Sequence, residues 1–408
     1  MGKMKFELVE EQNTIIDSSD TLIKVVGIGG CGCNVINDMC QMTMRDVELI
    51  AINTDSQSLN KIDSHEKIQI GKKVAKGRGT GNTPEKAQKS AEEDRNIIEN
   101  KLRGADMVVL VAGVGGGTGS GAGPVIADIA RGMDILTAAF VITPFNVELN
   151  EEKSRIVRES YASLKDKVDM IVDIPNEKIL ELFTEDTGMD EAYKAVNIVL
   201  IDIMRGLVKM ISKTGIQNID FADVKRAMKG KGNSFMGVGK ASGANRAKTA
   251  FENAIKNRFM GNPNLNDANF IVINFFGNMS VGDIKAIEEL KLKYTGAGAM
   301  VKFGHTNVAD MGDEIEVTML ISGLHDDALS GQGGTSEAYN QFTPLAAASK
   351  KDESSKPEES KETVDKEIQS AIEKSATDFM EGNYENEGLA IPTWQRIDIC
   401  RRHLPKLN

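Results

Sequence analysis

With 408 residues, 40% of them hydrophobic and 27% charged, the chain has the size and composition of a soluble protein with two domains. Its 49 basic and 60 acidic residues give a net charge of −11, which disfavours non-specific nucleic-acid binding because such binding needs a concentrated positive surface. No apolar run approaches the roughly 20 residues that cross a bilayer, and residues 1–20 lack the apolar core of a signal peptide. The four cysteines do not have the pattern of a disulfide framework. We therefore expect a cytoplasmic protein.

Apolar strands alternate with helices through the first half of the chain. Buried strands are expected at 22–28, 47–52, 107–112, 135–143 and 168–174, and helices at 35–44, 84–102 and 124–131. Thr83 has the residue type of a helix N-cap, and Pro84 that of a first helical position. This alternation predicts the α/β fold class, with a doubly wound parallel sheet.

A long helix is predicted over 190–212, where residues are apolar nearly all round. Such a helix has no solvated face and is typical of a helix buried between layers or domains. A second, smaller α/β domain is expected after it. Its elements are a helix from 221, helices near 244–258 and 280–293, and strands near 269–276, 298–304 and 314–322.

The character of the chain changes near its C-terminal end. Residues 331–388 hold few large apolar side chains and far more acidic than basic ones, which predicts a disordered, self-repelling linker. A surface helix over 362–374 is the alternative. Residues 389–397 regain apolar side chains and the last residues are basic, so this peptide is expected to bind a partner protein. Docking back on its own domain is the alternative there.

These changes divide the chain into six parts. They are an N-terminal extension (1–20), a first domain (21–187), a central helix (188–212), a second domain (213–325), a linker (326–388) and a C-terminal peptide (389–408). The boundaries follow from composition and from the expected elements.

Two glycine-rich loops each join an expected strand to an expected helix. The first satisfies the G-x-G-x-x-G pattern through Gly27, Gly29 and Gly32, which keeps a dinucleotide-binding oxidoreductase as one hypothesis. The second places five glycines within 115–121, a density that a dinucleotide fold does not need there. Successive backbone N–H groups and a helix dipole make such a loop a phosphate cradle. Neither loop contains lysine, so phosphate charge would be met by backbone amides and a bound cation, most simply Mg²⁺.

Further motifs accompany the loops in order: Asn53-Thr54-Asp55, the segment 77–85, Ile174-Pro175-Asn176 and the segment 218–223. With these motifs the chain resembles the FtsZ family, the tubulin-like GTPases of bacterial cell division, over about residues 20–325 and again at the terminal peptide. The resemblance implies that residues 21–187 bind GTP or GDP with Mg²⁺, and that 213–325 activate hydrolysis and support polymerisation. It also implies a head-to-tail homopolymer that forms the cytokinetic ring at mid-cell.

The resemblance extends to partners. The C-terminal peptide would recruit membrane-tethering and regulatory division proteins through Ile391, Pro392, Trp394 and Arg396. Contact with the membrane would therefore be indirect, without insertion, and no nucleic acid would be bound.

Individual residues of the nucleotide site are implied as well. The phosphates would contact Gly29, Gly30, Cys31, Gly32, Cys33, Asn34, Gly115, Gly116, Gly117, Thr118 and Gly119. Glu148 would face the sugar. The family's arginine is expected four residues later, where this chain has Glu152, and one extra residue in this stretch would bring Lys153 into the cationic role. Tyr193 and Asn197, four residues apart on one helical face, would stack on and hydrogen-bond the guanine. Without the resemblance, Tyr193 would be interpreted as a core aromatic.

Two cysteines depart from the family pattern. Cys31 and Cys33 stand where glycine or another small residue is usual, and they are either oxidisable or simply small enough to fit. No cluster of cysteine or histidine accompanies them, so no protein-bound metal site is expected.

Asn218, Asp220 and Asp223 are implied to enter the nucleotide site of the next subunit. Two carboxylates there would orient the attacking water and help to place the cation, so hydrolysis would require polymerisation. The alternative is that Asp220 caps the helix from 221, and both interpretations can hold together. A scaffold that binds nucleotide without turnover is a further hypothesis, which the presence of Asp220 and Asp223 disfavours.

Overall fold

The computed structural model describes residues 21–42, 47–64, 66–183, 186–212, 219–229, 233–256, 268–294, 299–308 and 311–324. The N-terminal extension, the linker, the C-terminal peptide and Asn218 lie outside these residues, so the predictions made for them are not tested by the fold. Among the described residues, no helix is long and apolar enough to cross a membrane.

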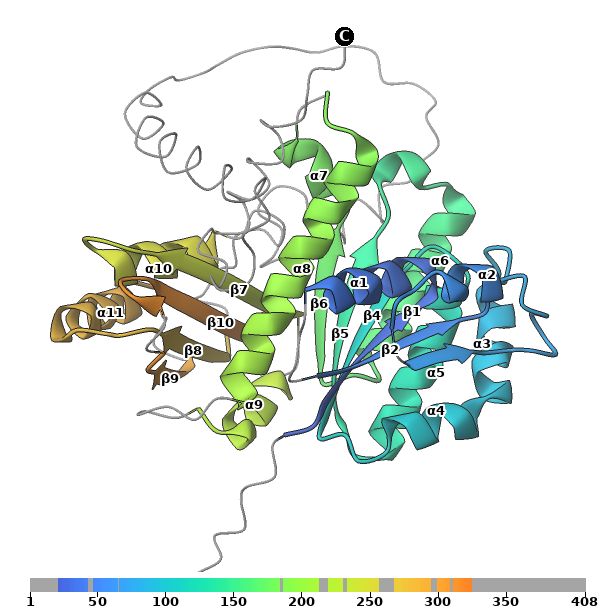
Figure 1. The fold of residues 1–408 in the computed structure, drawn as a ribbon, viewed down its shortest axis with the longest axis horizontal. Helices are drawn as coiled ribbons and strands as arrows, with labels where there is room; N and C mark the ends of the chain where they lie inside the picture. The colour runs from blue at the N-terminus through green and yellow to red at the C-terminus, as the bar shows by residue number, and fades with distance from the viewer. Residues whose placement is uncertain are drawn as a thin grey trace, which may run out of the picture.

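A six-stranded parallel sheet forms the centre of the first domain (Figure 1). Its strands are β1 (Ile23–Ile28), β2 (Val47–Asn53), β3 (Glu66–Gln69), β4 (Met107–Gly113), β5 (Leu136–Thr143) and β6 (Met170–Pro175). They run in the order β3-β2-β1-β4-β5-β6, with every neighbouring pair parallel. This confirms the predicted doubly wound sheet, and such sheets bind ligands beyond the carboxyl ends of the strands where the order reverses, here between β1 and β4.

Helices cover both faces of this sheet. The first face packs against α1 (Gly29–Gln41) and α8 (Met189–Ser212), and the opposite face against α3 (Pro84–Glu93), α4 (Arg95–Leu102), α5 (Thr118–Gly132) and α6 (Glu151–Lys165). Strand residues such as Val109 and Leu110 therefore point alternately into two separate cores. The shorter elements are α2 (Ser56–Asn60), a 3₁₀ turn (Asn146–Glu148) and α7 (Glu177–Leu182).

The helices differ from the prediction most clearly at three places, and α6 was not predicted. Helix α1 begins at Gly29 rather than 35, and α5 begins at Thr118 rather than 124, because both glycine loops turn directly into their helices. The helix expected over 84–102 is interrupted at Asp94, whose carboxylate accepts a hydrogen bond from the Gly71 N–H at 2.7 Å. The two residues are 23 positions apart, so the local sequence could not predict this interruption of the helix.

The second domain is a four-stranded sheet in the order β7-β10-β8-β9. Its strands are β7 (Asn233–Ala241), β8 (Phe270–Phe276), β9 (Met300–Thr306) and β10 (Ile315–Leu324), and its helices are α9 (Phe221–Met228), α10 (Arg246–Ile255) and α11 (Val281–Tyr294). Strand β10 is antiparallel to β7 and β8, whereas β8 and β9 are parallel. Strand β7 was not predicted.

Helix α8 lies between the two sheets, as its apolar sequence predicted (Figure 1). One continuous core joins the first sheet, α8 and the second sheet. Near the C-terminal end of α8, Lys209 pairs with Glu316 of β10 at 2.9 Å, and Lys240 of β7 pairs with the same carboxylate at 3.3 Å. Burial alone would raise the pKa of Glu316, but the two lysine charges outweigh it and lower that pKa from 4.5 to about 2.

Candidate functional site

The two glycine loops meet at the carboxyl ends of β1 and β4. Gly29, with φ at +72°, lies so close to the second loop that an added Cβ would stand 3.1 Å from the Gly119 nitrogen. The hydroxyls of Thr54 and Thr118 hydrogen-bond at 2.8 Å, which brings the end of β2 to the same place. The structure therefore gathers the ends of three neighbouring strands where a doubly wound sheet binds ligands.

The fold itself requires some of the glycines in these loops but not others. An added Cβ would collide with backbone at Gly27, Gly32, Gly119 and Gly121, so close packing requires glycine there. At Gly30 and Gly116, by contrast, an added Cβ would meet nothing within 4 Å, and neither residue has a left-handed φ. The fold gives no reason for glycine at these two positions. A ligand bound close to the backbone would explain why both residues are glycine.

Both helices that leave the loops begin with uncapped N-termini. No side chain caps α1 at Ile28 or α5 at Gly117, and neither first turn contains an acidic residue. The first N–H groups of a helix have no intrahelical partners, and the dipole favours an anion beside them. Two such ends beside open glycine backbone make a site that fits phosphate.

The thiols beside the first loop are not activated. Burial raises the pKa of Cys31 to about 12, and burial is also the main cause of a pKa of about 12 for Cys33. Cys33 is buried, with its sulfur 3.6 Å from the Ile52 carbonyl oxygen. A protonated thiol is a poor nucleophile and is oxidised slowly. The structure therefore favours the interpretation that Cys31 and Cys33 are present because they are small enough to fit. Among the described residues, no group of three or more His, Cys, Asp or Glu side chains could hold a metal ion.

Tyr193 of α8 stands at the edge of this site. Its ring packs edge-on against Phe145, with the centroids 5.9 Å apart, and 40% of the residue remains exposed. Burial raises the pKa of the Tyr193 hydroxyl, and the charge of the nearby Glu148 carboxylate raises it further; Cys31 also lies close enough to interact with this hydroxyl. Because Tyr193 is this exposed and lies beside the first loop, it is not a core residue.

Glu148 and Lys153 also lie beside the second loop. They form an ion pair, and the Lys153 side chain runs past Gly115, where an added Cβ would stand 3.2 Å from the Lys153 Cε. The Lys153 side chain thus lies between the second loop and Glu148. The sugar-binding roles of both residues stay predictions.

Asn197, one helical turn after Tyr193, contacts a residue that the sequence did not single out. Its amide nitrogen donates a hydrogen bond to the Asp38 carboxylate of α1 at 2.7 Å. The two residues are 159 positions apart, so no local motif could have paired them.

Asp220 is the N-cap of α9 and Asp223 lies in its first turn. Helix α9 lies near the C-terminal end of α8, away from Tyr193 and Asn197 (Figure 1). Asp220 is exposed and caps α9, accepting a hydrogen bond from the Asp223 N–H at 2.7 Å, which confirms the cap interpretation. The Asp223 carboxylate pairs with Lys302 of β9 at 3.1 Å, with 11% of its side chain exposed. From Asn197 to Ser212 the helix alone rises about 22 Å. The predicted catalytic carboxylates are therefore far from the glycine loops of their own chain.

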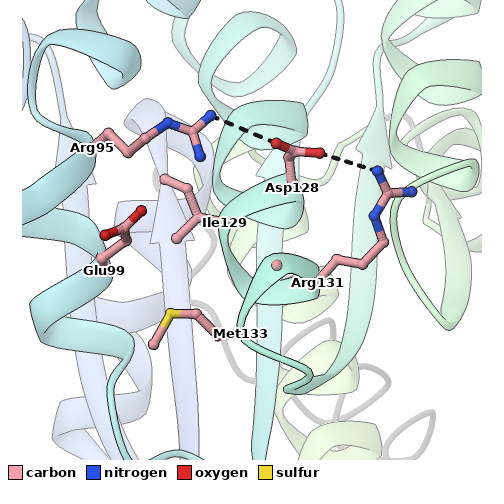
Figure 2. A pocket seen from close by; sticks show the side chains of 7 residues that line it. Arg95, Glu99, Asp128, Ile129, Arg131 and Met133 are labelled. Carbon is pink, nitrogen blue, oxygen red and sulfur yellow. Dashed lines mark hydrogen bonds and ion pairs between the residues drawn. The ribbon is translucent and has the colours of Figure 1, made fainter.

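The structure also contains a cavity of about 440 Å³ away from the loops (Figure 2). It lies between α4 and α5, and Asp128 in its wall pairs with Arg95 at 3.6 Å and with Arg131 at 3.1 Å. Arg131 stands at the C-terminal end of α5, opposite the end that begins in the loop. Figure 2 shows Asp128 paired with both arginines, and the cavity lies away from the loops, so it is not the candidate site.

Comparisons with known proteins match both domains. Residues 22–184 match the family model described as the GTPase domain of the tubulin/FtsZ family, and residues 232–325 match the C-terminal domain of the FtsZ family. The cell division protein FtsZ of Pseudomonas aeruginosa is 39% identical over 321 residues, covering 78% of this chain and 80% of that protein. The FtsZ of Buchnera aphidicola from Acyrthosiphon pisum is 36% identical over 309 residues, covering 75% and 80%.

Solved structures agree with these matches. An FtsZ dimer of M. jannaschii has a TM-score of 0.67 and 31% identity, covering 76% of this chain and 90% of that chain. CetZ2 of Haloferax volcanii, solved as a protofilament with GTPγS bound, has a TM-score of 0.65 at 19% identity, which shows a shared fold alone.

Proposed function

Since the chain belongs to the FtsZ family of tubulin-like GTPases, we propose that its GTP is hydrolysed in a site that the next subunit of a head-to-tail filament completes. The protein is a GTP-binding cell-division protein that polymerises, and ring formation is the role of its family. This assignment replaces the oxidoreductase hypothesis.

The binding half of the site is built from the chain's own loops. The open backbone at Gly30 and Gly116, with the uncapped starts of α1 and α5, would hold the phosphates. Tyr193 would stack on the base, and Glu148 with Lys153 would meet the sugar. Because the loops contain no lysine, a bound Mg²⁺ would supply the missing positive charge.

The proposal depends most on the position of the predicted catalytic carboxylates. Asp220 is exposed but lies at the far end of α8, so it cannot reach the γ-phosphate on its own chain. Stacking subunits in one orientation brings this end of one chain to the loops of the next, and such heterologous contacts propagate as a filament. Asp220 would then orient the attacking water. Asp223, held by Lys302, would shape the field around that water and the cation.

The remaining parts follow the family pattern. We place the protein in the cytoplasm, in a ring at mid-cell. Residues 326–388 would act as a tether, and the peptide 389–408 would recruit membrane-tethering and regulatory proteins. Both segments lie outside the described residues.

A complementation experiment tests the shared site. Asp220→Asn keeps a good helix cap but removes the carboxylate, and Gly116→Ala impairs the phosphate loop. Each variant alone should hydrolyse little GTP. Mixed in equal amounts they should recover up to about one quarter of the wild-type rate, the share of junctions with an intact loop and an intact carboxylate under random assembly. Absence of any recovery, in mixtures that still form filaments, would refute the shared site.

A further inference from the structure

A hydrogen bond ties α1 to α8 beside the proposed base site. Asn197 of α8 donates its amide N–H to the Asp38 carboxylate of α1, and both residues are half-buried. Burial raises the pKa of Asp38, and the Asn197 hydrogen bond and the charge of Lys194 offset this only in part. A carboxylate in such a place is costly unless further donors reach it.

The position of Asp38 on its helix points to what those donors are. Asp38 lies nine residues after Gly29, about 13 Å along α1 from the first loop. Exposed Asn34 precedes it by one turn on the same helical face, and Tyr193 stands one turn before Asn197 on α8. A nucleotide with its phosphates at the loop and its base against Tyr193 would thus turn the edge of the base toward Asp38 and Asn197.

The donor and acceptor pattern of the pair matches one base. Because Asn197 donates its N–H to Asp38, its amide oxygen stays available as an acceptor beside the second carboxylate oxygen of Asp38. Guanine presents two neighbouring donors, N1–H and the 2-amino group, whereas adenine has an acceptor at N1 and no 2-amino group. Two adjacent acceptors therefore select guanine.

We propose that Asp38 is a specificity-determining residue that accepts a hydrogen bond from guanine together with Asn197. This rests on the proposed function only in assigning the face of Tyr193 and Asn197 to the base. A purely structural tie between α1 and α8 is the competing explanation, and it involves no contact with the nucleotide.

Nucleotides that differ only at position 2 of the base separate the two explanations. Inosine triphosphate lacks the 2-amino group, and xanthosine triphosphate carries an oxygen acceptor there. The wild-type chain should bind GTP roughly 10- to 100-fold more tightly than either. Equal affinity for GTP and inosine triphosphate would overturn the proposal, and this measurement needs no variant.

The Asp38→Asn variant should reverse the preference. Its amide oxygen can still accept from Asn197, so the tie between the helices is kept, while its N–H group now faces position 2 of the base. We expect GTP affinity to fall roughly 10- to 100-fold and affinity for xanthosine triphosphate to rise by a similar factor. Asp128→Asn, the same change in the distant cavity of Figure 2, should leave both affinities unchanged.

An unchanged ratio of GTP to xanthosine triphosphate affinity in Asp38→Asn would contradict the proposal, even if both affinities fell together. That outcome is distinguishable from failure of the shared catalytic site. Base selection is measured by binding alone, whereas the shared site is tested by hydrolysis in mixtures.

Discussion

Replacing Gly116 with alanine should weaken GTP binding without weakening the fold. An added Cβ at Gly116 meets nothing within 4 Å, and its φ is not left-handed, so alanine is tolerated and restricts the unfolded chain. A compatible glycine-to-alanine change stabilises a fold by about 0.4–1 kcal/mol. The same methyl group would enter the space that we assign to the phosphates. Forcing an extra methyl into a close contact costs about 1–3 kcal/mol, so GTP affinity should fall roughly 5- to 150-fold.

Gly121→Ala is the matched control. An added Cβ at Gly121 would collide with the Pro84 carbonyl oxygen of α3, so that variant should lose about 1–3 kcal/mol of stability. Titration with a fluorescent GTP analogue measures the affinity, and urea unfolding without nucleotide measures the free energy of unfolding. Wild-type GTP binding by Gly116→Ala, or unfolding as easy as that of Gly121→Ala, would show that Gly116 does not lie against the phosphates in open space.

Three further predictions concern other parts of the chain. Asp220→Asn should bind GTP normally but release phosphate at least about 100-fold more slowly, and a wild-type rate would remove Asp220 from catalysis. Glu316→Gln should lower the free energy of unfolding by about 3 kcal/mol at neutral pH, because Lys209 and Lys240 lose their buried partner. Those lysines lower the Glu316 pKa from 4.5 to about 2, so the stabilisation is complete above pH 4.5 and is lost as the pH falls toward 2. Urea unfolding of the variant and the wild type measures this pH dependence. A difference in the free energy of unfolding that stays constant over that range would contradict the prediction. Deleting residues 389–408 should leave the GTPase rate and filament formation, followed by light scattering, nearly unchanged, whereas loss of both would mean that the peptide docks on the body.

The two glycine-rich loops could be predicted because a cluster of glycines is visible in the local sequence. Gly30 and Gly116 stand in glycine-rich runs, and each run directly follows a buried strand. The doubly wound sheet followed from the same alternation. Sequence could not show where the loop gives way to helix, because Thr118 to Gly121 are poor helix formers that become helical in their packed setting.

Strand β7 was missed for a related reason. Gly237 and Gly239 weaken a strand pattern, yet an added Cβ at either would collide with the backbone of α10, so these glycines allow that helix to pack closely on the sheet. The pairing of Asp38 with Asn197 was missed because it joins two helices through space. Local sequence indicates which residues could bind a ligand, but only the fold shows which of them face one another.

In the proposed filament, one chain holds the nucleotide and the next supplies the carboxylates. The most direct test is phosphate release from GTP with Mg²⁺, measured per molecule as a function of protein concentration. We expect a rate near zero below a threshold concentration and a steep rise above it, because hydrolysis needs a junction between subunits. A rate per molecule that is independent of concentration would show that each chain is catalytically complete and would rule out the shared site.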